Sequence, residues 1–455
     1  MKSNTIKSIN PFNGKLIKTY ELFTDKTVEN TVSKAHETQQ DWKLLDIDDR
    51  TELLAELSDT LLKNKQMYAE LMTNEMGKPI SQSIAEIEKC VFLCDFYETN
   101  SEELLSDEII DTEAEESFIS YDPLGVILGV MPWNYPFWQV MRFAVPTLMA
   151  GNTVLLKHAA NVSGCALILQ KLFEDAGFPK GCFQTLLVNH NQIESIIADS
   201  RIKAVSLTGS EKAGRKIAEI AGRNLKKCVL ELGGNNACIV LNDADLDKHL
   251  DTIVNARMQN TGQSCIAAKR FIVEAGIYDV FLEKFQKKVS SLKLGEPLNS
   301  ETQITVLARP DLADDLQKQI NDSIEKGAKV IIGNIKKDAY FAPTIVTNVT
   351  PEMPVFDEET FGPVAAIIKA KDVEDAYELA ANSKLGLGTM IFSKNTNDTI
   401  DRISSIEDGA FFVNELVKSD PRLPFGGTKN SGYGRELSRE GILEFTNKKT
   451  VYVSK

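Results

Sequence analysis

The sequence predicts an α/β fold with two domains, and three observations support this. Short apolar runs alternate with helical stretches between residues 125 and 232, and the alternation resumes after residue 265. The length of 455 residues exceeds what a single hydrophobic core ordinarily serves. A hydrophobic content of 43% and a charged content of 25% are typical of a globular protein. We therefore expect two substantial α/β domains and a smaller element.

The N-terminal part is predicted to be helical. Apolar residues recur at helical spacing from Asp48 to Lys78, where Gly77-Lys78-Pro79 indicates a helix end. A second helix is expected from Ser81 to about Ser101. Cys90 and Cys94 lie one turn apart on it, with no histidine or second cysteine pair nearby. We expect both to be core side chains and not metal ligands.

The predicted strands are short apolar runs, and two further segments alternate in the manner of exposed strands. Those two segments, Ser117–Tyr121 and Lys449–Val453, would leave exposed sheet edges unless they pair, so pairing between subunits is expected. We therefore expect a homodimer or a homotetramer. The apolar runs are 125–131, 153–157, 204–207 and 228–232 in the first half, and 270–274, 329–333, 389–393 and 410–414 in the second.

The composition limits the kinds of partner that the protein is expected to bind. The formal net charge of −14 and the pI near 5.0 argue against binding to nucleic acid or to an anionic membrane. The N-terminus lacks the apolar core of a signal peptide, and no apolar run of about 18 residues follows, so a cytoplasmic location is expected. Seven scattered cysteines indicate reduced thiols, and four scattered histidines indicate no metal site.

Three residues could carry chemistry. Cys265 ends Gln259-Asn-Thr-Gly-Gln-Ser-Cys265, where small residues would bring a thiol into a cleft, although a lone cysteine is more often inert. Glu231 ends an apolar strand before Gly233-Gly234, where burial would raise its pKa toward that of a general base; an ion pair with Lys227 is an equal alternative. Asn134 lies between Pro132 and Pro136, where it is either a turn residue or an oxyanion donor.

A possible phosphate site follows the strand at 204–207. Thr208-Gly-Ser-Glu-Lys-Ala-Gly214 opens a helix near Ser210, whose first amides could hold a pyrophosphate. The loop alone is weak support, because Gly and Ser are also ordinary cap residues. The usual G-x-G-x-x-G pattern is absent.

Together these motifs resemble those of the aldehyde dehydrogenase superfamily. They occur in the same order and at the same spacing as in that family, across nearly the whole chain. The resemblance implies two Rossmann-like α/β domains plus a small β oligomerisation element. It places the dinucleotide-binding domain at 1–107 and 123–233, the catalytic domain at 234–430, and the oligomerisation element at 108–122 and 431–455. The motifs are Pro132-Trp-Asn-Tyr-Pro136, Gly151-Asn-Thr-Val-Leu-Leu-Lys157, Thr208-Gly-Ser210, Glu231-Leu-Gly-Gly234, Gly262-Gln-Ser-Cys265, Glu359-Thr-Phe-Gly-Pro363 and Pro424-Phe-Gly-Gly427.

The resemblance also implies a mechanism. Cys265 attacks an aldehyde, the Asn134 amide and the Cys265 N–H hold the oxyanion, hydride leaves to a nicotinamide, and Glu231 activates water against the thioester. Its cofactor-binding residues would be Trp133, Lys157, Ala160, Gly209, Ser210, Glu359 and Phe361.

One departure from the family bears on the cofactor. Ala160 stands where NAD-preferring relatives often carry a Glu, so nothing there repels a 2′-phosphate. With Lys157 near, and His158 as a further candidate, NADP is favoured, and NAD stays compatible.

The substrate prediction rests on Arg142 and Ser419, which match the pattern of succinate-semialdehyde dehydrogenases of the compact bacterial type. Arg142 would grip the distal carboxylate of a small aldehyde, and the alternative is an internal ion pair. Trp138 and Phe425 complete the expected substrate site. Arg257 is a further candidate, and Phe143 replaces a lysine that is common in those relatives.

Three other functions compete with this one. The enzyme could oxidise uncharged aliphatic aldehydes, with Arg142 in a structural ion pair. The chain could be a catalytically silent structural protein of the same fold, although the set of Asn134, Glu231 and Cys265 argues against that. A cysteine hydrolase is disfavoured because no histidine stands in a recognisable pairing with Cys265.

Overall fold

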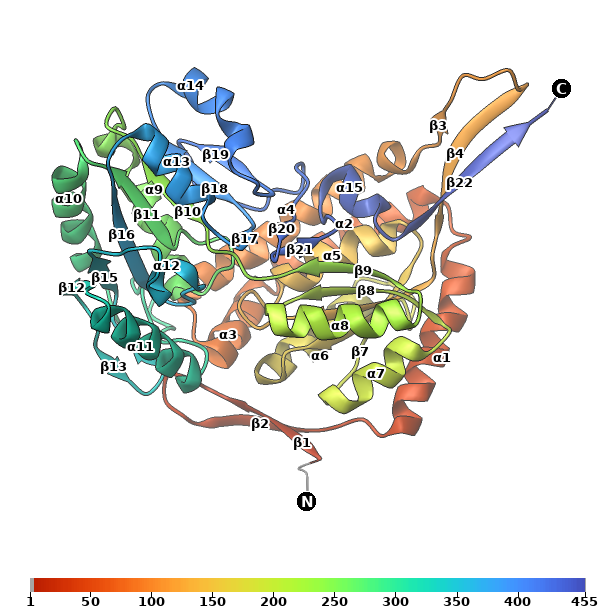
Figure 1. Cartoon of the computed structure of the whole chain (residues 1–455). Helices are drawn as coiled ribbons and strands as arrows, with labels where there is room; N and C mark the ends of the chain where they lie inside the picture. Colours follow the sequence, from red (N-terminus) through yellow and green to blue (C-terminus); the bar gives the residue numbers. More distant parts are fainter. Residues whose placement is uncertain (1–3, 455) are drawn as a thin grey trace.

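The computed structural model of the chain describes residues 4–454 and contains two large, mainly parallel sheets, which occupy the right and left halves of Figure 1. Residues 1–3 and 455, the outer ends of the expected first domain and oligomerisation element, lie outside the described residues. The predicted α/β class with Rossmann-like domains is confirmed.

The first sheet has the strand order β21-β9-β8-β5-β6-β7, and every pair is parallel except β21 with β9. Its central strands are buried along their length, which explains their continuous apolar sequences. The strands are β5 (Val126–Met131), β6 (Thr153–His158), β7 (Phe183–Thr185), β8 (Ile202–Thr208), β9 (Lys227–Glu231) and β21 (Gly432–Tyr433).

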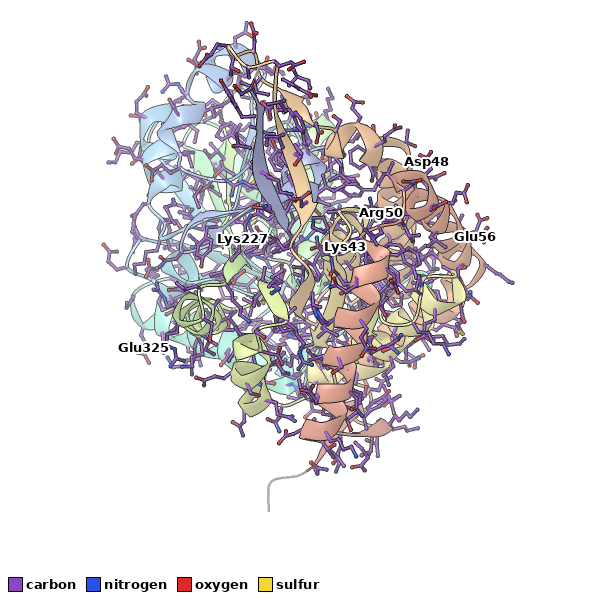
Figure 2. All side chains as sticks on the ribbon, turned by 90° about the vertical axis from the view of Figure 1, so that its right-hand side faces the viewer. Lys43, Asp48, Arg50, Glu56, Lys227 and Glu325 are labelled. Carbon is purple, nitrogen blue, oxygen red and sulfur yellow. The ribbon has the colours of Figure 1, made fainter. Side chains whose placement is uncertain are left out.

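Helices cover both faces of this sheet. One face packs against α1, α7 and α8, and the other packs against α5 and α6, with α2 to α4 forming an outer layer. In Figure 2, Asp48 and Glu56 of α2 project from the outside of that layer. The helices are α1 (Asp25–Trp42), α2 (Ile47–Lys63), α3 (Lys65–Met76), α4 (Ile80–Leu105), α5 (Trp138–Met149), α6 (Ser163–Asp175), α7 (His190–Ala198) and α8 (Glu211–Arg223).

The helix expected from Asp48 to Lys78 is two helices. The break is at Asn64, whose φ of −105° and ψ of 11° leave the helical region and whose side chain donates to the Thr60 carbonyl. The stop at Gly77 is confirmed, since its φ of 82° is left-handed. The second predicted helix is α4, and Cys90 and Cys94 are fully buried in the core beneath it.

The second sheet has the order β12-β15-β16-β11-β10-β18-β19, parallel except for β12 with β15. Apolar clusters fill both faces. The strands are β10 (Ala237–Val240), β11 (Arg270–Glu274), β12 (Lys329–Ile332), β15 (Thr344–Thr347), β16 (Val364–Ala370), β18 (Thr389–Phe392) and β19 (Phe411–Val413); the helices are α9 (Leu246–Met258), α10 (Tyr278–Ser290), α11 (Pro310–Glu325), α12 (Pro354–Asp357), α13 (Val373–Ala381) and α14 (Thr396–Asp401).

A third, three-stranded sheet projects from the body in Figure 1 with the order β22-β4-β3. The two predicted edge segments pair with each other, because β4 (Glu116–Pro123) runs antiparallel to β22 (Thr446–Val453). Short β3 (Glu108–Ile109) completes the sheet. The smaller two-stranded sheets are β1 (Thr5–Ile9) with β2 (Leu16–Glu21), β13 (Lys336–Lys337) with β14 (Tyr340–Phe341), and β17 (Leu385–Gly386) with β20 (Thr428–Lys429).

The segment expected to join the oligomerisation element from residue 431 is divided between two sheets. Gly432–Tyr433 pairs with β9 of the first sheet, and α15 (Ser438–Leu443) packs on α4 and α5. Residues 432–443 therefore lie against the first sheet and its helices, and the projecting sheet takes up only Thr446–Val453 from the C-terminal segment. Within residues 4–454, no helix is both long and apolar enough to span a membrane.

Candidate active site

Cys265 follows a backbone segment with left-handed geometry. Asn260, Thr261 and Gly262 have φ values of 54°, 53° and 74°, and such values are costly for residues other than glycine. Hydrogen bonds secure the turn: Asn260 Nδ2 donates to the Asn134 carbonyl at 2.8 Å, and the Ala308 N–H donates to Gln263 Oε1 at 2.8 Å. The loop is thus held in a strained form that presents the thiol.

Arg257 belongs to this scaffold and does not line the Cys265 cavity described below. Its buried guanidinium donates to the carbonyls of Ala268 at 2.9 Å, Gly262 at 2.6 Å and Gly362 at 2.5 Å. The structure therefore gives Arg257 a structural role and opposes the suggestion that it contacts substrate.

Cys265 is partly buried and opens into a cavity of about 230 Å³. Burial raises the pKa of the thiol, and the positive charges of Arg142 and Lys269 act in the opposite direction. The cavity wall includes all four residues that the sequence predicted for substrate: Trp138, Arg142, Ser419 and Phe425.

Asn134 lies beside the Cys265 loop. Its buried amide donates from Nδ2 to the Gln263 carbonyl at 3.2 Å, two residues before the thiol. The turn that carries it is secured by His158, whose Nδ1 accepts from the Ala159 N–H, so Nε2 carries the proton and donates to the Pro136 carbonyl at 2.9 Å. Burial lowers the pKa of His158 to about 4, so the ring is neutral. His158 is thereby committed to the turn and not to a cofactor phosphate.

Glu231 ends β9 in a buried position, and neither carboxylate oxygen has a hydrogen-bond partner among the described residues. Burial, followed by the negative charge of Glu436, raises its pKa well above the ordinary value, while Arg142 opposes the rise. A methyl group added at Gly426 would approach Glu231 Oε1 to 2.9 Å, so the carboxyl packs against that glycine. It is not part of the wall around Cys265. The ion pair with Lys227, which was the alternative to a general base, does not form, since Lys227 pairs with Glu444.

Arg142 lines the cavity, but it already has an anionic partner. Its Nε forms a buried ion pair with Glu436, its guanidinium lies 4.6 Å from the Phe425 ring centroid, and Nη2 reaches Thr208 Oγ1 only at 3.5 Å. This is the internal ion pair that the sequence analysis kept as the alternative. Sequence reasoning missed Glu436 because nothing in its local sequence marks it as buried.

Lys89 of α4 is a cavity residue that the sequence did not reveal. Its Nζ donates to Ser419 Oγ at 2.8 Å and lies 4.0 Å from the Trp138 ring centroid. Lys269 was also missed: its buried Nζ donates to the Ser264 carbonyl at 2.8 Å and pairs with Glu359 at 3.2 Å. The one available signal for Lys89 was its position directly before Cys90 on a predicted helix.

The predicted cofactor residues gather at the carboxyl ends of the parallel strands in the first sheet and across from them. Lys157 lies in β6, and Gly209 and Ser210 follow β8, where Ser210 caps α8 by accepting from the Ala213 N–H at 3.4 Å. The amides at the start of this 13-residue helix suit an anionic group. Ala160 is exposed at the start of a 3₁₀ turn (Ala160–Val162).

Three further observations fit a dinucleotide. The side chain of Lys157 is buried with no hydrogen bond or ion pair to another described residue, and burial lowers its pKa. Trp133 and Phe361 meet edge to face at 5.6 Å, and Glu359 accepts from the Gly234 N–H at 3.2 Å. A largely buried ammonium group without a partner requires a hydrogen-bond acceptor, which a phosphate oxygen or a ribose hydroxyl would supply. No group of three metal-ligating side chains occurs in the described part of the chain.

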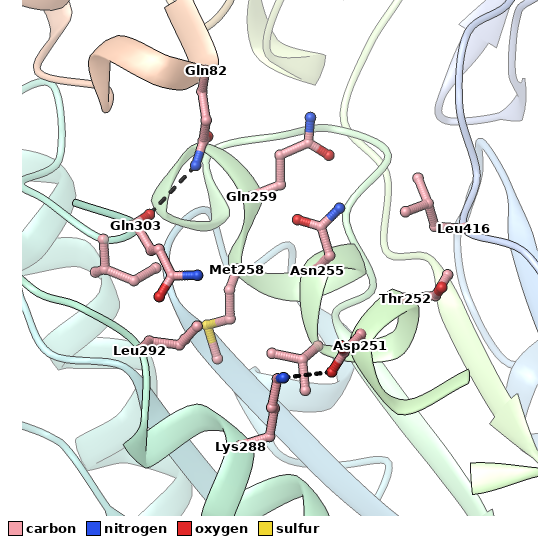
Figure 3. A pocket seen from close by; sticks show the side chains of 12 residues that line it. Gln82, Asp251, Thr252, Asn255, Met258, Gln259, Lys288, Leu292, Gln303 and Leu416 are labelled. Atoms are coloured by element: carbon pink, nitrogen blue, oxygen red, sulfur yellow. Dashed lines mark hydrogen bonds and ion pairs between the residues drawn. The ribbon is translucent and has the colours of Figure 1, made fainter. Parts of the chain in front are cut away.

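A second cavity of about 440 Å³ adjoins the first and shares Gln82, Gln259 and Leu416 with it. Figure 3 shows amide side chains around it, including Asn255, with Gln82 Nε2 donating to the Gln303 carbonyl at 3.4 Å. Lys288 on its far side pairs with Asp251 at 2.6 Å.

Comparisons with known proteins agree with this geometry. The chain is 48% identical to "Probable succinate-semialdehyde dehydrogenase [NADP(+)]" of Synechocystis, over 99% of this chain and 100% of the relative. It is 45% identical to "Succinate semialdehyde dehydrogenase [NAD(P)+] Sad" of Escherichia coli, over 98% and 97%. A solved succinic semialdehyde dehydrogenase from Streptococcus pyogenes, in complex with NADP+, superposes with a TM-score of 0.97 at 36% identity, covering 99% of this chain and 100% of that one.

The family model described as "Aldehyde dehydrogenase family" matches residues 1–451. Both large sheets, the Cys265 loop and the predicted cofactor residues fall within that match. The chain therefore belongs to the aldehyde dehydrogenase family.

Proposed function

We propose that this enzyme oxidises succinate semialdehyde, or a similar short carboxylated aldehyde, to the acid, with NADP as the favoured cofactor. The observation that carries the proposal is the cavity of about 230 Å³, which has the Cys265 thiol in its wall together with the cationic side chains Arg142 and Lys89. Its size suits a small aldehyde, and its charge suits an anionic one. The names of the relatives from Synechocystis and Escherichia coli support the same substrate.

In the proposed reaction, the Cys265 thiol gives its proton to water, and its sulfur then bonds to the aldehyde carbon as the C=O bond becomes a C–O⁻ single bond. The Asn134 amide and the Cys265 N–H donate to the oxygen as it becomes negative. When bound, the nicotinamide accepts the hydride that leaves this carbon, so that an acyl thioester remains on Cys265. Glu231 then takes a proton from water, which attacks the thioester and releases the acid and the thiol.

This role for Glu231 requires its carboxyl to turn toward the thioester. It is buried without a hydrogen bond on either oxygen, so no strong local bond holds it beside Gly426. Its raised pKa suits a group that must accept a proton.

The cofactor would be held by Lys157 and Glu359 at its riboses and by the Gly209-Ser210 turn at its pyrophosphate. Trp133 and Phe361 would pack near the nicotinamide. The small, exposed Ala160 at the start of its 3₁₀ turn leaves space and no negative charge for a 2′-phosphate. The curated name "[NADP(+)]" of the Synechocystis relative supports this preference.

Steady-state kinetics with succinate semialdehyde and butanal, each with NADP and with NAD, tests the proposal. We expect kcat/KM to be at least about tenfold higher for the charged aldehyde, because a charge-assisted hydrogen bond contributes that much discrimination. Equal values for both aldehydes would instead support the second candidate, a dehydrogenase of uncharged aldehydes. That candidate is favoured by one observation, the pairing of Arg142 with Glu436.

We further propose that the chain forms a homodimer or a homotetramer through the projecting sheet. The exposed side chains Ile109 and Tyr452, 74% and 53% accessible, lie on strands β3 and β22 of that sheet. Exposed apolar residues on an outer strand invite pairing with another copy. Light scattering after size-exclusion chromatography measures the assembly, and a monomer would contradict the proposal.

A further inference from the structure

Lys89 is a cation on the wall of the Cys265 cavity that the proposed mechanism does not use. It extends from the middle of α4, is partly buried, and shares the wall with Trp138 and Ser419. Its Nζ donates to Ser419 Oγ at 2.8 Å and lies over the Trp138 ring, 4.0 Å from the centroid. The ammonium group is therefore held in one place by two neighbours.

No carboxylate pairs with Lys89 among residues 4–454. The carboxylates whose negative charge acts on the pKa of Lys89 are those of Glu86 and Asp420, and both have other partners. Glu86 pairs with Lys78 and accepts from the N–H groups of Phe137 and Trp138. Asp420 pairs with Arg422 at 2.7 Å.

The two other cations of the wall differ in this respect, because Lys418 pairs with Glu415 at 3.3 Å and Arg142 pairs with Glu436. Arg142 is neutralised by Glu436, and a cation that already has a buried partner attracts a further anion weakly. Lys89 carries the charge that the surrounding side chains leave uncompensated. Burial and the proximity of Arg142 lower the pKa of Lys89 to about 7, and a bound anion would reverse that shift.

Ser419 completes the arrangement. Its Oγ accepts two hydrogen bonds, from Lys89 Nζ and from Trp138 Nε1 at 3.0 Å. A hydroxyl oxygen has two lone pairs and one proton, and both lone pairs of Ser419 Oγ are occupied. Only its O–H is therefore left to donate a hydrogen bond to a ligand. An ammonium group and a hydroxyl donor side by side form a binding site for a carboxylate.

We propose that Lys89, together with Ser419, binds the distal carboxylate of the substrate and so sets the preference for carboxylated aldehydes. The inference rests on the proposed function and deepens it, because it moves the main charge recognition from Arg142 on α5 to Lys89 on α4. The side chain acts on binding, at the end of the substrate away from Cys265.

The test replaces Lys89 with Met, which keeps the length and contacts of the side chain and removes the charge. For Lys89→Met, kcat/KM for succinate semialdehyde falls by on the order of 10- to 100-fold, chiefly through KM, because one charge-assisted hydrogen bond is lost. For butanal it changes by less than about twofold, as for a substitution that leaves the fold intact. Lys89→Arg, which keeps the charge, restores part of the loss.

The matched control is Lys65→Met. Lys65 pairs at the surface with Glu88, the residue before Lys89, at 2.8 Å, so this change removes a lysine charge near the same helix without touching the cavity. Its kinetics with both aldehydes match those of the wild type.

The outcomes separate this inference from the proposed function. If the wild type shows no preference for the charged aldehyde, the proposed function fails. If the wild type prefers it and Lys89→Met loses activity equally with both aldehydes, Lys89 is structural and the inference is overturned. Should that variant fold poorly, as judged by its thermal midpoint, the ratio between the two substrates for Lys89→Arg and Lys89→Gln decides the same question.

The pH dependence gives an independent readout. KM for succinate semialdehyde rises as the pH increases above about 7, since Lys89 becomes neutral, and KM for butanal does not. The groups that act on Lys89 are Arg142 of α5, Glu86 and Cys90 of α4, and Asp420 of the loop beyond β19. A pH-dependent KM that persists in Lys89→Met would assign the titration to one of these and contradict the inference.

Discussion

Replacing Arg142 with Met tests whether this arginine holds substrate or holds the site together. Arg142 is 1% exposed and forms a buried ion pair with Glu436, which is 4% exposed. Removal of one partner from a buried pair leaves an uncompensated charge and costs about 3–5 kcal/mol. The variant therefore loses a large part of the 5–15 kcal/mol that stabilises a typical domain.

Activity falls together with stability. Arg142 opposes the rise in the pKa of Glu231, so its loss raises that pKa further and leaves less of the carboxylate form. Hydrolysis of the thioester then slows for every acyl group, whether or not the aldehyde carries a charge. We expect kcat for succinate semialdehyde and for butanal to fall by similar factors.

The double variant Arg142→Met, Glu436→Met isolates the pair. It removes both charges, and replacing a buried ion pair with apolar side chains is about neutral or stabilising by 1–4 kcal/mol, so stability returns toward the wild type. Urea denaturation of the wild type, both single variants and the double variant gives the four free energies of unfolding. A selective loss of succinate semialdehyde turnover in Arg142→Met, with unchanged stability, would refute the reasoning and restore Arg142 as the carboxylate ligand.

Three other perturbations have defined outcomes. Glu231→Gln slows steady-state turnover by about 10²–10⁴-fold, while a first turnover that forms the thioester persists. Because the pKa of Glu231 is raised, the wild-type rate falls as the pH decreases through that pKa. A Glu231→Gln variant whose rate still falls with decreasing pH in this way would exclude Glu231 as the base. Ala160→Glu lowers kcat/KM with NADP about tenfold or more relative to NAD through like-charge repulsion, and equal losses with both cofactors would contradict a 2′-phosphate beside Ala160. Peroxide inactivates the enzyme irreversibly, since Cys265 has no adjacent cysteine with which to form a protective disulfide; recovery of activity with dithiothreitol would show this to be wrong.

Most of the fold could be predicted from the sequence because local patterns of apolar residues mark the strands and helices. The parallel strands are continuous apolar runs, and runs such as 125–131 and 270–274 are found as β5 and β11. The break at Asn64 could not be predicted, because the apolar spacing continues across it while one residue leaves the helical region. The short strand Gly432–Tyr433 joins the first sheet by pairing with a strand about 200 residues earlier, which no local pattern encodes.

The candidate site likewise has one part that the sequence predicts and one part that it does not. Cys265 and the four predicted substrate residues lie on one cavity, and the motifs that marked them are contiguous in sequence. The partners that set their electrostatics are distant: Glu436 meets Arg142 across 294 positions, and Lys89 meets Ser419 across 330. A single sequence shows which charged residues exist, but burial and pairing across elements decide which of them keep an effective charge.

The charges around the cavity balance in pairs, with one exception. A carboxylate offsets each paired cation, so these pairs contribute little net electric field in the cavity. Lys89 alone adds a positive charge that no described carboxylate cancels, and it does so on the wall that also holds Cys265. A single uncompensated cation on the wall that also holds Cys265 favours an aldehyde with one negative charge. The buried or mostly buried pairs are Arg142 with Glu436, Lys78 with Glu86, and Lys269 with Glu359, and the exposed pair is Lys418 with Glu415.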